Sequence, residues 1–81
     1  MKFSFSEKFL KSYAAAPEQI RRAFDKQSRF LLLNIRHPSL HAKKYDESKD
    51  IWQARVNAGW RFYFTIENGV YCLQDIIKHP K

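Results

Sequence analysis

The C-terminal half of the chain alternates large apolar side chains with polar ones, as strands with one buried face do. Two short polar segments, at residues 57–59 and 67–69, interrupt this alternation. The second contains Asn68-Gly69, a pair that favours a tight hairpin. The pattern therefore predicts three consecutive strands over residues 51–77. We place the last one inside the sheet, because it is apolar on both faces apart from Gln74 and Asp75.

The same alternation assigns side chains to the two faces of the predicted sheet. One face carries the large apolar residues Trp52, Ala54, Val56, Trp60, Phe62, Phe64 and Ile66. The opposite face carries Arg55 from the first strand, and Arg61, Tyr63 and Thr65 from the second. Both arginines are therefore expected on a face that the apolar core does not occupy.

The N-terminal half has the spacing of a short strand followed by two helices. Residues 2–5 alternate, and Ser6 is a suitable N-cap for a helix whose apolar face holds Phe9, Leu10, Tyr13 and Ala14. Pro17 is expected to open a second helix, because proline is tolerated at the first helical position. The apolar stripe of that helix comprises Ile20, Ala23, Phe24, Leu31 and Ile35. Residues 40–45 are predicted to be extended, and residues 46–50 to form a polar turn.

This order of elements predicts an α+β protein. An N-terminal strand and a helical hairpin pack on one face of a small, mainly antiparallel, curved sheet. The 81 residues are expected to form a single domain, residues 1–81. Aromatic residues make up 16% of the chain, which is enough to build a core without disulfides.

Composition also indicates the cellular compartment of the protein. The single cysteine, Cys72, lies in an apolar strand and is expected to be a small buried side chain, in keeping with the reducing cytosol. We expect no secretory signal, because the first residues lack an apolar stretch, and no apolar run is long enough to span a bilayer. The predicted location is the cytoplasm.

The chain is strongly basic, with fifteen Lys and Arg against eight Asp and Glu and a net charge of +7. This excess favours an anionic partner, either nucleic acid, an acidic protein or an anionic membrane. The sequence contains no Cys/His set with zinc spacing and no glycine-rich phosphate loop, and its carboxylates are scattered. We therefore expect no metal and no cofactor.

Three segments in the second half of the chain carry a resemblance to a known family. They are Leu40-His-Ala-Lys-Lys-Tyr45, then Arg55-Val-Asn-Ala-Gly-Trp-Arg61 followed by Phe-Tyr-Phe, and finally Asp75-Ile-Ile-Lys-His-Pro-Lys81. In this order and at these intervals they resemble the RelE/ParE toxins of type II toxin–antitoxin systems. The order of predicted strands and helices is also similar to that family's.

The resemblance implies a toxin that a cognate antitoxin neutralises in a hetero-oligomeric complex. RelE-like members are mRNA interferases, endoribonucleases that inhibit translation by cutting messenger RNA on the ribosome without a metal. On this reading the partners are the antitoxin, the ribosome and mRNA, with no membrane. Two alternatives stay open: a ParE-like inhibitor of DNA gyrase without catalysis, and a non-toxic remnant that only binds antitoxin. Because these branches share a fold, fold cannot decide between them.

The resemblance also nominates site residues. Arg61 matches the catalytic arginine, whose planar fork suits a phosphate, and His79 matches a terminal group that acts as acid, base or phosphate ligand. Arg55 either assists Arg61 in catalysis or forms a structural pair with an acidic neighbour. Lys44 is named as a catalytic electrostatic group and Lys43 as an RNA contact, although which of the two faces the groove is undecided. The other proposed RNA contacts are His41, Tyr63, Lys78 and Lys81. For each residue a solvated or structural role is the alternative.

Overall fold

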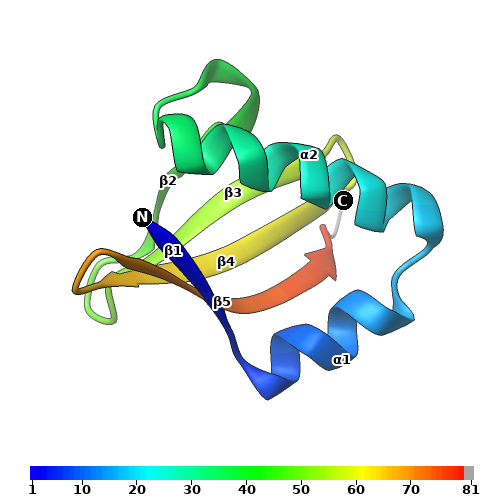
Figure 1. Cartoon of the computed structure of the whole chain (residues 1–81), viewed down its shortest axis with the longest axis horizontal. Helices are drawn as coiled ribbons and strands as arrows, with labels where there is room; N and C mark the ends of the chain where they lie inside the picture. Colours follow the sequence, from blue (N-terminus) through cyan, green and yellow to red (C-terminus); the bar gives the residue numbers. More distant parts are fainter. Residues whose placement is uncertain (80–81) are drawn as a thin grey trace.

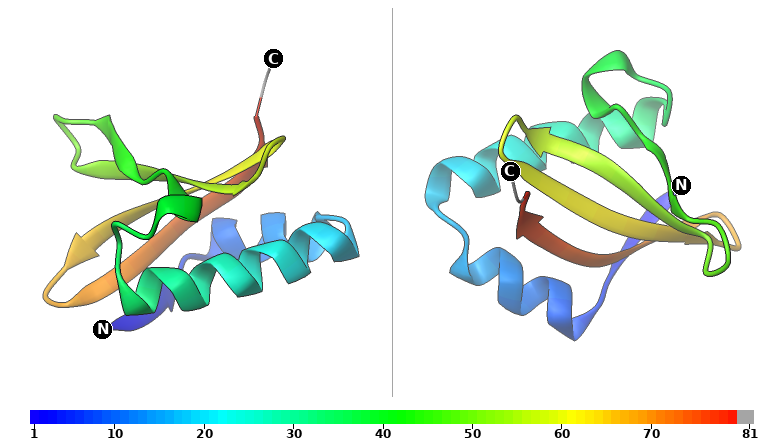
Figure 2. Two further views of the ribbon diagram at one scale, coloured as in Figure 1. Left: turned by 90° about the horizontal axis from the view of Figure 1, so that it is seen from above. Right: turned by 180° about the vertical axis from the view of Figure 1, so that it is seen from behind.

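The computed structural model describes residues 1–79, which form two layers, a five-stranded sheet and a pair of helices (Figure 1). Both helices lie on the same side of the sheet, and the opposite face is left open (Figure 2). The predicted α+β architecture is therefore confirmed. In chain order the elements are β1 (Lys2–Phe5), α1 (Glu7–Ala15), α2 (Glu18–Leu33), the 3₁₀ helix η1 (Pro38–Leu40), β2 (Lys43–Asp46), β3 (Ile51–Asn57), β4 (Trp60–Glu67) and β5 (Val70–Lys78).

The strands lie in the order β1-β5-β4-β3-β2. The pairs β2–β3, β3–β4 and β4–β5 are antiparallel, whereas β1 runs parallel to β5, with Lys2 opposite Val70. Strand β5 therefore has neighbours on both sides, as its apolar composition predicts. A parallel partner 68 residues away in the sequence cannot be predicted from local periodicity, because parallel strands need a long crossover connection.

The hairpin between β4 and β5 turns at the predicted Asn-Gly pair. Asn68 and Gly69 both have positive φ angles, 51° and 76°. A two-residue turn of this hand matches the right-handed twist of the flanking strands. Glycine adopts such angles without strain, and asparagine tolerates them better than most residues. The turn thus sets the register of β4 against β5 as far as the Phe64–Leu73 pair, beyond which a bulge shifts it by one residue.

The core fills the space between the helices and the sheet and contains many aromatic rings. Phe62 and Phe64 of β4 are both 0% exposed, and Phe24 of α2 meets Phe62 edge to face with ring centroids 5.1 Å apart. Edge-to-face contacts of this kind add to the stabilisation from burial alone. The buried apolar residues are Phe9, Ala16, Ile20, Phe24, Leu31, Leu40, Ala54, Val56, Phe62, Phe64, Tyr71, Leu73 and Ile76.

Ser6 joins the first helix to the sheet. Its hydroxyl oxygen accepts a hydrogen bond from the backbone N–H of Phe9 at 3.0 Å, which is the predicted N-cap. The same hydroxyl donates to the carbonyl of Gln74 in β5 at 3.1 Å. Pro17 is the residue that precedes α2, one position earlier than the first helical place predicted for it.

Three details of the predicted helical faces are wrong. Leu10 is 52% exposed and Ala14 is also exposed, because α1 packs on β5 and α2 mainly through Phe9 and Tyr13. Ile35 lies beyond the end of α2 and packs on the core from the following loop. No helix among residues 1–79 is long and apolar enough to cross a membrane.

Two other expectations are also corrected. Residues 40–45 are not extended throughout: Leu40 ends η1, His41 has a left-handed φ of 47°, and β2 begins only at Lys43. Pro38 favours this early turn, because its fixed φ suits the start of a short helix. Cys72 is half-buried instead of buried, since it lies on the sheet face that the helices leave open, between Ser4 of β1 and Thr65 of β4.

Candidate functional site

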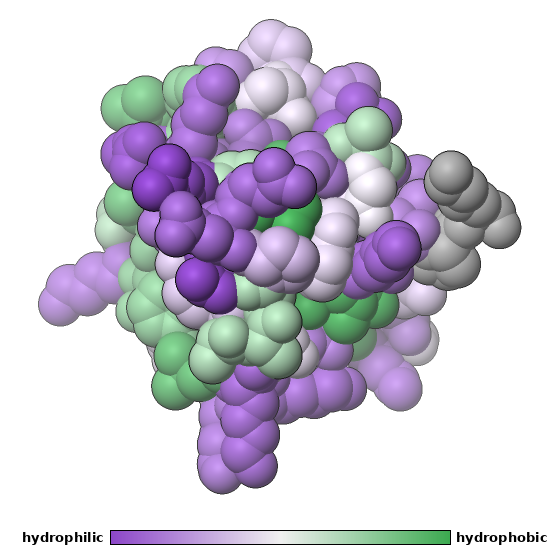
Figure 3. All heavy atoms as spheres, turned by 90° about the vertical axis from the view of Figure 1, so that its right-hand side faces the viewer, coloured by the Kyte–Doolittle hydropathy of each residue, from purple (hydrophilic) through white to green (hydrophobic). Residues whose placement is uncertain are grey.

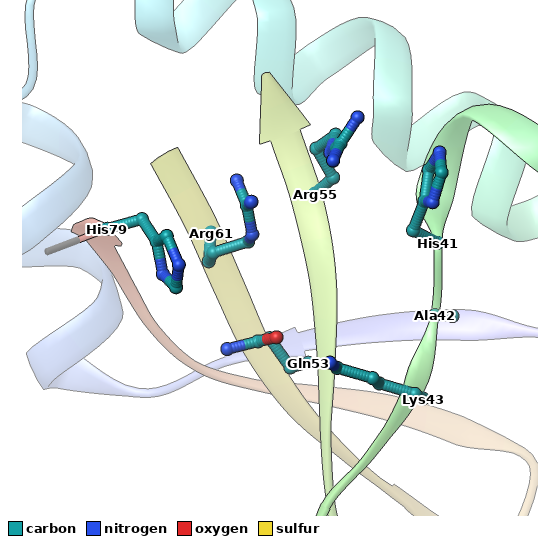
Figure 4. Close-up of a pocket in the computed structure, with 7 residues that line it drawn as sticks. All are labelled: His41, Ala42, Lys43, Gln53, Arg55, Arg61 and His79. Atoms are coloured by element: carbon teal, nitrogen blue, oxygen red, sulfur yellow. The ribbon is translucent and has the colours of Figure 1, made fainter. Parts of the chain in front are cut away.

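The open face of the sheet contains a groove of about 370 Å³ near the C-terminal end of β5 (Figure 4). We call it the basic groove, defined by its lining residues His41, Ala42, Lys43, Gln53, Arg55, Arg61 and His79. Five of the nine residues that the resemblance nominated therefore come together in one place. The side of the molecule shown in Figure 3 mixes hydrophilic and hydrophobic residues.

Four of these side chains form a row across the sheet. His79 follows β5, Arg61 lies on β4, Arg55 on β3, and His41 just before β2 (Figure 4). Arg55 is directly opposite Arg61 in the β3–β4 register. Neighbouring strands are about 4.8 Å apart, so the backbone positions at the two ends of the row are separated by roughly 14 Å. The row thus places two arginines between two histidines.

The turn between β3 and β4 holds the Arg61 guanidinium. Its Nη1 atom donates to the carbonyl oxygens of Asn57 at 2.8 Å and Trp60 at 3.0 Å, with Ala58 further away at 3.4 Å. These hydrogen bonds use one of the three guanidinium nitrogens, and an arginine side chain has five N–H donors. Arg61 is therefore oriented by its own turn and keeps donors for a ligand.

Two buried nitrogens in the basic groove have no hydrogen-bond partner among residues 1–79, Nε of Arg55 and Nδ1 of His79. A buried polar atom without a partner costs about 1–3 kcal/mol, so such atoms are uncommon without a functional reason. The backbone N–H of His79 donates to the carbonyl of Gly59 at 2.8 Å, which ties the end of β5 to the turn that holds Arg61. Both nitrogens are closed to solvent, so the side chain of Arg55 or of His79 must turn before its nitrogen can reach a ligand.

The charges of the basic groove are uncompensated within residues 1–79. Lys43, Arg55 and Arg61 line it, and no Asp or Glu does. Like charges directly opposite each other on neighbouring strands destabilise a sheet, so the Arg55–Arg61 pair is costly in the free protein. The ion pairs found among these residues all lie outside the lining set, at Lys8–Asp75, Lys11–Glu7, Arg22–Glu18 and Lys44–Asp50.

The structure decides which of the two adjacent lysines faces the groove. Lys43 is opposite Gln53 in the β2–β3 register and lines the groove, whereas Lys44 is opposite Trp52 on the other face. The Nζ atom of Lys44 lies 2.7 Å from Oδ1 of Asp50, and this hydrogen bond raises the pKa of the ammonium group. Lys44 is therefore a charged, paired lysine outside the groove, a placement that does not support its nomination as catalytic.

The remaining nominated residues lie outside the basic groove. Tyr63 accepts a hydrogen bond from Nε2 of Gln53 at 3.0 Å and packs against Tyr45, with ring centroids 5.0 Å apart, in a neighbouring hollow. Lys78 is opposite Trp60, on the face of the sheet away from Arg61. Lys81 lies outside the described residues. Among residues 1–79, no group of three or more His, Cys, Asp or Glu side chains is placed to hold a metal ion.

Gln27 is a structural support of the groove that the sequence reading missed. It is buried in α2, where Nε2 donates to the carbonyl of Arg55 at 2.8 Å and to that of Ser39 at 3.0 Å. Its Oε1 accepts from the Ser39 hydroxyl at 3.1 Å. Gln27 thus fastens β3, at Arg55, to the loop that carries His41. A signal was present, because Gln27 interrupts an apolar stripe at the same helical spacing as Phe24 and Leu31.

Replacing Gln27 with leucine is expected to lower the free energy of unfolding by about 2 kcal/mol, because two partly buried carbonyls lose their donor. Chemical denaturation monitored by circular dichroism would measure this. Gln19→Leu is the matched control, since Gln19 is exposed on the same helix. Equal stability of the two variants would show that the Gln27 hydrogen bonds do not hold the fold.

Comparison with known proteins establishes the fold and leaves the activity open. The sequence matches no protein-family model, and no curated protein sequence is significantly similar to it. Among solved structures, a YoeB/ParE toxin from Agrobacterium tumefaciens superposes with a TM-score of 0.80 at 11% identity, over 99% of this chain and 100% of the other. The archaeal RelE–RelB complex from Pyrococcus horikoshii OT3 superposes with a TM-score of 0.80 at 13% sequence identity, over 99% of this chain and 96% of the other. YafQ from E. coli strain BL21(DE3) superposes with a TM-score of 0.77 at 14% identity, over 94% of this chain and 90% of the other. The chain therefore has the RelE/ParE toxin fold.

Proposed function

We propose that this protein, with its RelE/ParE toxin fold, is the toxin of a type II toxin–antitoxin system and cuts messenger RNA on the ribosome. The observation that carries the proposal is the composition of the basic groove. Arg55 and Arg61 lie side by side between His41 and His79, with no carboxylate among the lining residues. Cleavage of a phosphodiester needs positive charge near the phosphate oxygens. It also needs a proton acceptor near the attacking oxygen and a proton donor near the leaving oxygen.

The proposed reaction is attack of a ribose 2′-hydroxyl on the adjacent phosphorus. The 2′-oxygen loses its proton to a base and forms a new P–O bond, while the bond to the 5′-oxygen breaks and that oxygen takes a proton from an acid. The products are a 2′,3′-cyclic phosphate on the upstream fragment and a 5′-hydroxyl on the downstream one. One P–O bond forms and one breaks, so the step consumes no further reactant.

Arg61 and Arg55 would balance the negative charge that builds up on the phosphate oxygens during this attack. Arginine binds two phosphate oxygens at once, and fixed donors directed at a developing charge give large rate effects. Arg61 is already oriented by the turn carbonyls, so little reorganisation is needed when substrate binds. The unpartnered Nε of Arg55 would gain an acceptor in the complex.

His41 and His79 would handle the protons. Imidazole exchanges protons near neutral pH, and the two histidines flank the arginines at opposite ends of the row. In an in-line displacement the entering and leaving oxygens lie on opposite sides of the phosphorus. One histidine at each end therefore suits one base and one acid.

His41 also provides a prediction in which stability and activity change in opposite directions. Its φ of 47° is unfavourable for any residue with a Cβ, so His41→Gly is expected to raise the free energy of unfolding by about 0.5–1 kcal/mol. The same change removes an imidazole from the groove, and cleavage is expected to fall at least about tenfold. Denaturation curves and cleavage of mRNA on purified ribosomes would measure the two effects. His41→Asn, which tolerates the backbone angle, should lose activity with little change in stability. Unaltered cleavage by both variants would remove His41 from the mechanism.

The proposed partner that controls this toxin is an antitoxin with an acidic segment. The Pyrococcus structure is a RelE–RelB complex, and here the net charge of +7 and the basic groove favour a negatively charged ligand. Between 0.1 and 0.5 M salt, the affinity for the antitoxin encoded beside this gene is expected to fall at least about tenfold, because salt screens the attraction. Isothermal titration calorimetry would test this, and an affinity independent of salt would refute the electrostatic part.

Brief induction in bacterial cells followed by primer extension on a translated messenger tests the proposed function. We expect new 5′ ends inside codons with the wild type and none with Arg61→Ala. Intact messenger with arrested growth would favour a ParE-like action on gyrase, which needs neither histidine. Intact messenger with normal growth would leave a protein that only binds antitoxin.

A further inference from the structure

The last strand of the sheet, β5, contains a β-bulge shortly before it reaches the basic groove. Strands β4 and β5 pair in one register as far as Phe64 and Leu73, and Gln74 is then an extra residue with no residue opposite it. An inserted residue of this kind bends a strand and redirects the side chains that follow, and bulges are common beside active sites. We propose that the start of α1 holds this bulge and thereby directs the imidazole of His79 into the groove. The inference rests on the proposed function and extends it to residues that lie outside the groove.

The bulge decides which face of the sheet His79 occupies. Side chains of a regular strand alternate, so an uninterrupted β5 with Leu73 in the core would place Asp75 in the core and His79 on the helix-covered face. With the bulge, Ile76 is 1% exposed in the core and His79 lines the groove. Burial of an apolar side chain in place of a carboxylate favours this arrangement, because an unpaired buried charge is costly. The bulge is therefore the feature of β5 that places His79 beside Arg61 (Figure 4).

Ser6, at the junction of β1 and α1, binds the bulge through two hydrogen bonds. Its backbone N–H donates to the carbonyl of Leu73 at 3.1 Å, and its hydroxyl donates to the carbonyl of Gln74 at 3.1 Å. The second bond gives the extra residue a partner, which matters because the extra residue of a bulge lies outside the regular ladder. The same hydroxyl accepts from the backbone N–H of Phe9 and so caps α1. One side chain thus fixes the helix and the bulge relative to each other.

Lys8 makes a further contact to the bulge from the first turn of α1. Its Nζ atom lies 3.6 Å from Oδ2 of Asp75, and the other carboxylate oxygen accepts from the backbone N–H of Ile76 at 2.9 Å. The carboxylate is thereby bound on one side by the helix and on the other by its own strand. None of the residues that line the basic groove belongs to α1. Ser6 and Lys8 therefore act on His79 through β5, as positioning residues and not as catalytic ones.

The segment between the bulge and His79 is held at both ends. The start of α1 holds the bulge, and the backbone N–H of His79 donates to the carbonyl of Gly59 at 2.8 Å. A displacement of about 1 Å at a catalytic group can lower a rate by about 100-fold. Loosening the bulge alone, with the far end still tied, should therefore lower the rate several-fold without abolishing it.

A double-mutant cycle between Ser6 and His79 tests the proposal, with the single-turnover rate of mRNA cleavage on programmed ribosomes, at saturating protein, as its readout. Ser6→Asp keeps an oxygen that caps α1 but removes the hydroxyl donor to Gln74, and we expect it to lower the rate about fivefold. In a His79→Ala background the same change should have no further effect, because Ser6 acts through His79. Ser6→Thr keeps the hydroxyl and should cleave at the wild-type rate.

Lys8→Ala and Lys11→Ala form a matched pair on α1. Each removes one exposed positive charge and one ion pair, but the Lys8 pair reaches β5 whereas Lys11 pairs with Glu7 of its own helix. We expect Lys8→Ala to lower the rate about twofold and Lys11→Ala to leave it unaltered. Thermal unfolding of each variant shows whether it is folded, and this exposed pair keeps the proposal testable if Ser6→Asp does not fold.

The remaining outcomes overturn either the proposal or the function on which it rests. An equal loss from Ser6→Asp in both backgrounds would show that Ser6 acts on the fold and not through His79. An unaltered rate in folded Ser6→Asp, or equal rates for Lys8→Ala and Lys11→Ala, would overturn the role of α1. A wild-type protein that cleaves no mRNA would refute the proposed function. Nuclear Overhauser contacts between the His79 ring and the Arg61 side chain would then decide the inference: their loss in Ser6→Asp would support it and their persistence would refute it.

Discussion

Arg61→Ala is expected to lower the single-turnover rate of mRNA cleavage on programmed ribosomes by about 100-fold or more. Removal of one fixed donor to a developing negative charge typically costs a factor of 10²–10³ in rate. Arg61 is the groove cation that is already held in place, by the carbonyls of Asn57 and Trp60, so its loss removes a preorganised contact. Arg61→Lys should recover only part of the rate, because an ammonium group cannot bind two phosphate oxygens as a planar fork does.

Two controls separate this effect from damage to the fold. Arg61→Ala also removes the hydrogen bonds to the β3–β4 turn, so its thermal unfolding must be measured beside its activity. Arg29→Ala removes the same charge from the exposed side of α2 and is expected to cleave at close to the wild-type rate. A folded Arg61→Ala variant with unaltered cleavage would exclude Arg61 from the transition state.

Phe62→Ala is expected to reduce the free energy of unfolding by about 3–5 kcal/mol, the range for truncation of a fully buried phenylalanine. Phe62 is 0% exposed and lies directly behind the groove, between Arg61 and Tyr63 in β4. It contacts Phe24 of α2 edge to face and Phe64 at 5.7 Å. A domain of 81 residues typically has a total free energy of unfolding of roughly 4–12 kcal/mol, so this variant should be close to unfolded at 37 °C.

Ile66→Ala is the matched control for that prediction. Ile66 belongs to the same strand and was expected on the same apolar face, but it is 40% exposed near the Asn-Gly turn. Its truncation should cost about 1 kcal/mol or less, since little apolar area leaves contact with the core. Urea denaturation of both variants would measure the difference. Similar losses at the two positions would contradict the observed placement of the core.

Local patterns were sufficient to predict the sheet face on which the groove forms. Period-two alternation places Trp52 and Phe62 on one side and Arg55 and Arg61 on the other, and burial of the first set holds this arrangement in place. The Asn-Gly turn sets the β4–β5 register as far as the Phe64–Leu73 pair, and a bulge beyond it shifts the register by one residue before the row is reached. The alternation and the turn are short-range effects that a single sequence contains, whereas the bulge has no such local signature.

Other parts of the site depend on contacts between distant segments. The side that Lys43 faces follows from the left-handed turn at His41 and the pairing of β2 with β3, neither of which has a strong local signature. The role of Gln27 requires the carbonyls of Ser39 and Arg55 to converge on α2. The exposure of Leu10 depends on how α1 lies against β5. Such features arise only when tertiary packing brings the segments together.

The unpaired positive charges of the basic groove favour the proposed function and reduce the stability of the free protein. Arg55 and Arg61 face each other across two strands, and Nε of Arg55 and Nδ1 of His79 are buried without partners among residues 1–79. Each of these features costs stability in the free protein. A phosphate bound between the arginines would relieve the repulsion between them, which is why we assign the groove to an anionic ligand.

Analysis of the cleaved RNA ends tests the central claim most directly. Purified protein would be added to ribosomes that hold a defined messenger with an empty A site, and both fragments would be examined by mass spectrometry. We predict a cut within the A-site codon that leaves a 2′,3′-cyclic phosphate upstream and a 5′-hydroxyl downstream. An uncut messenger, or a 3′-hydroxyl with a 5′-phosphate, would contradict the assignment of the basic groove to 2′-hydroxyl attack.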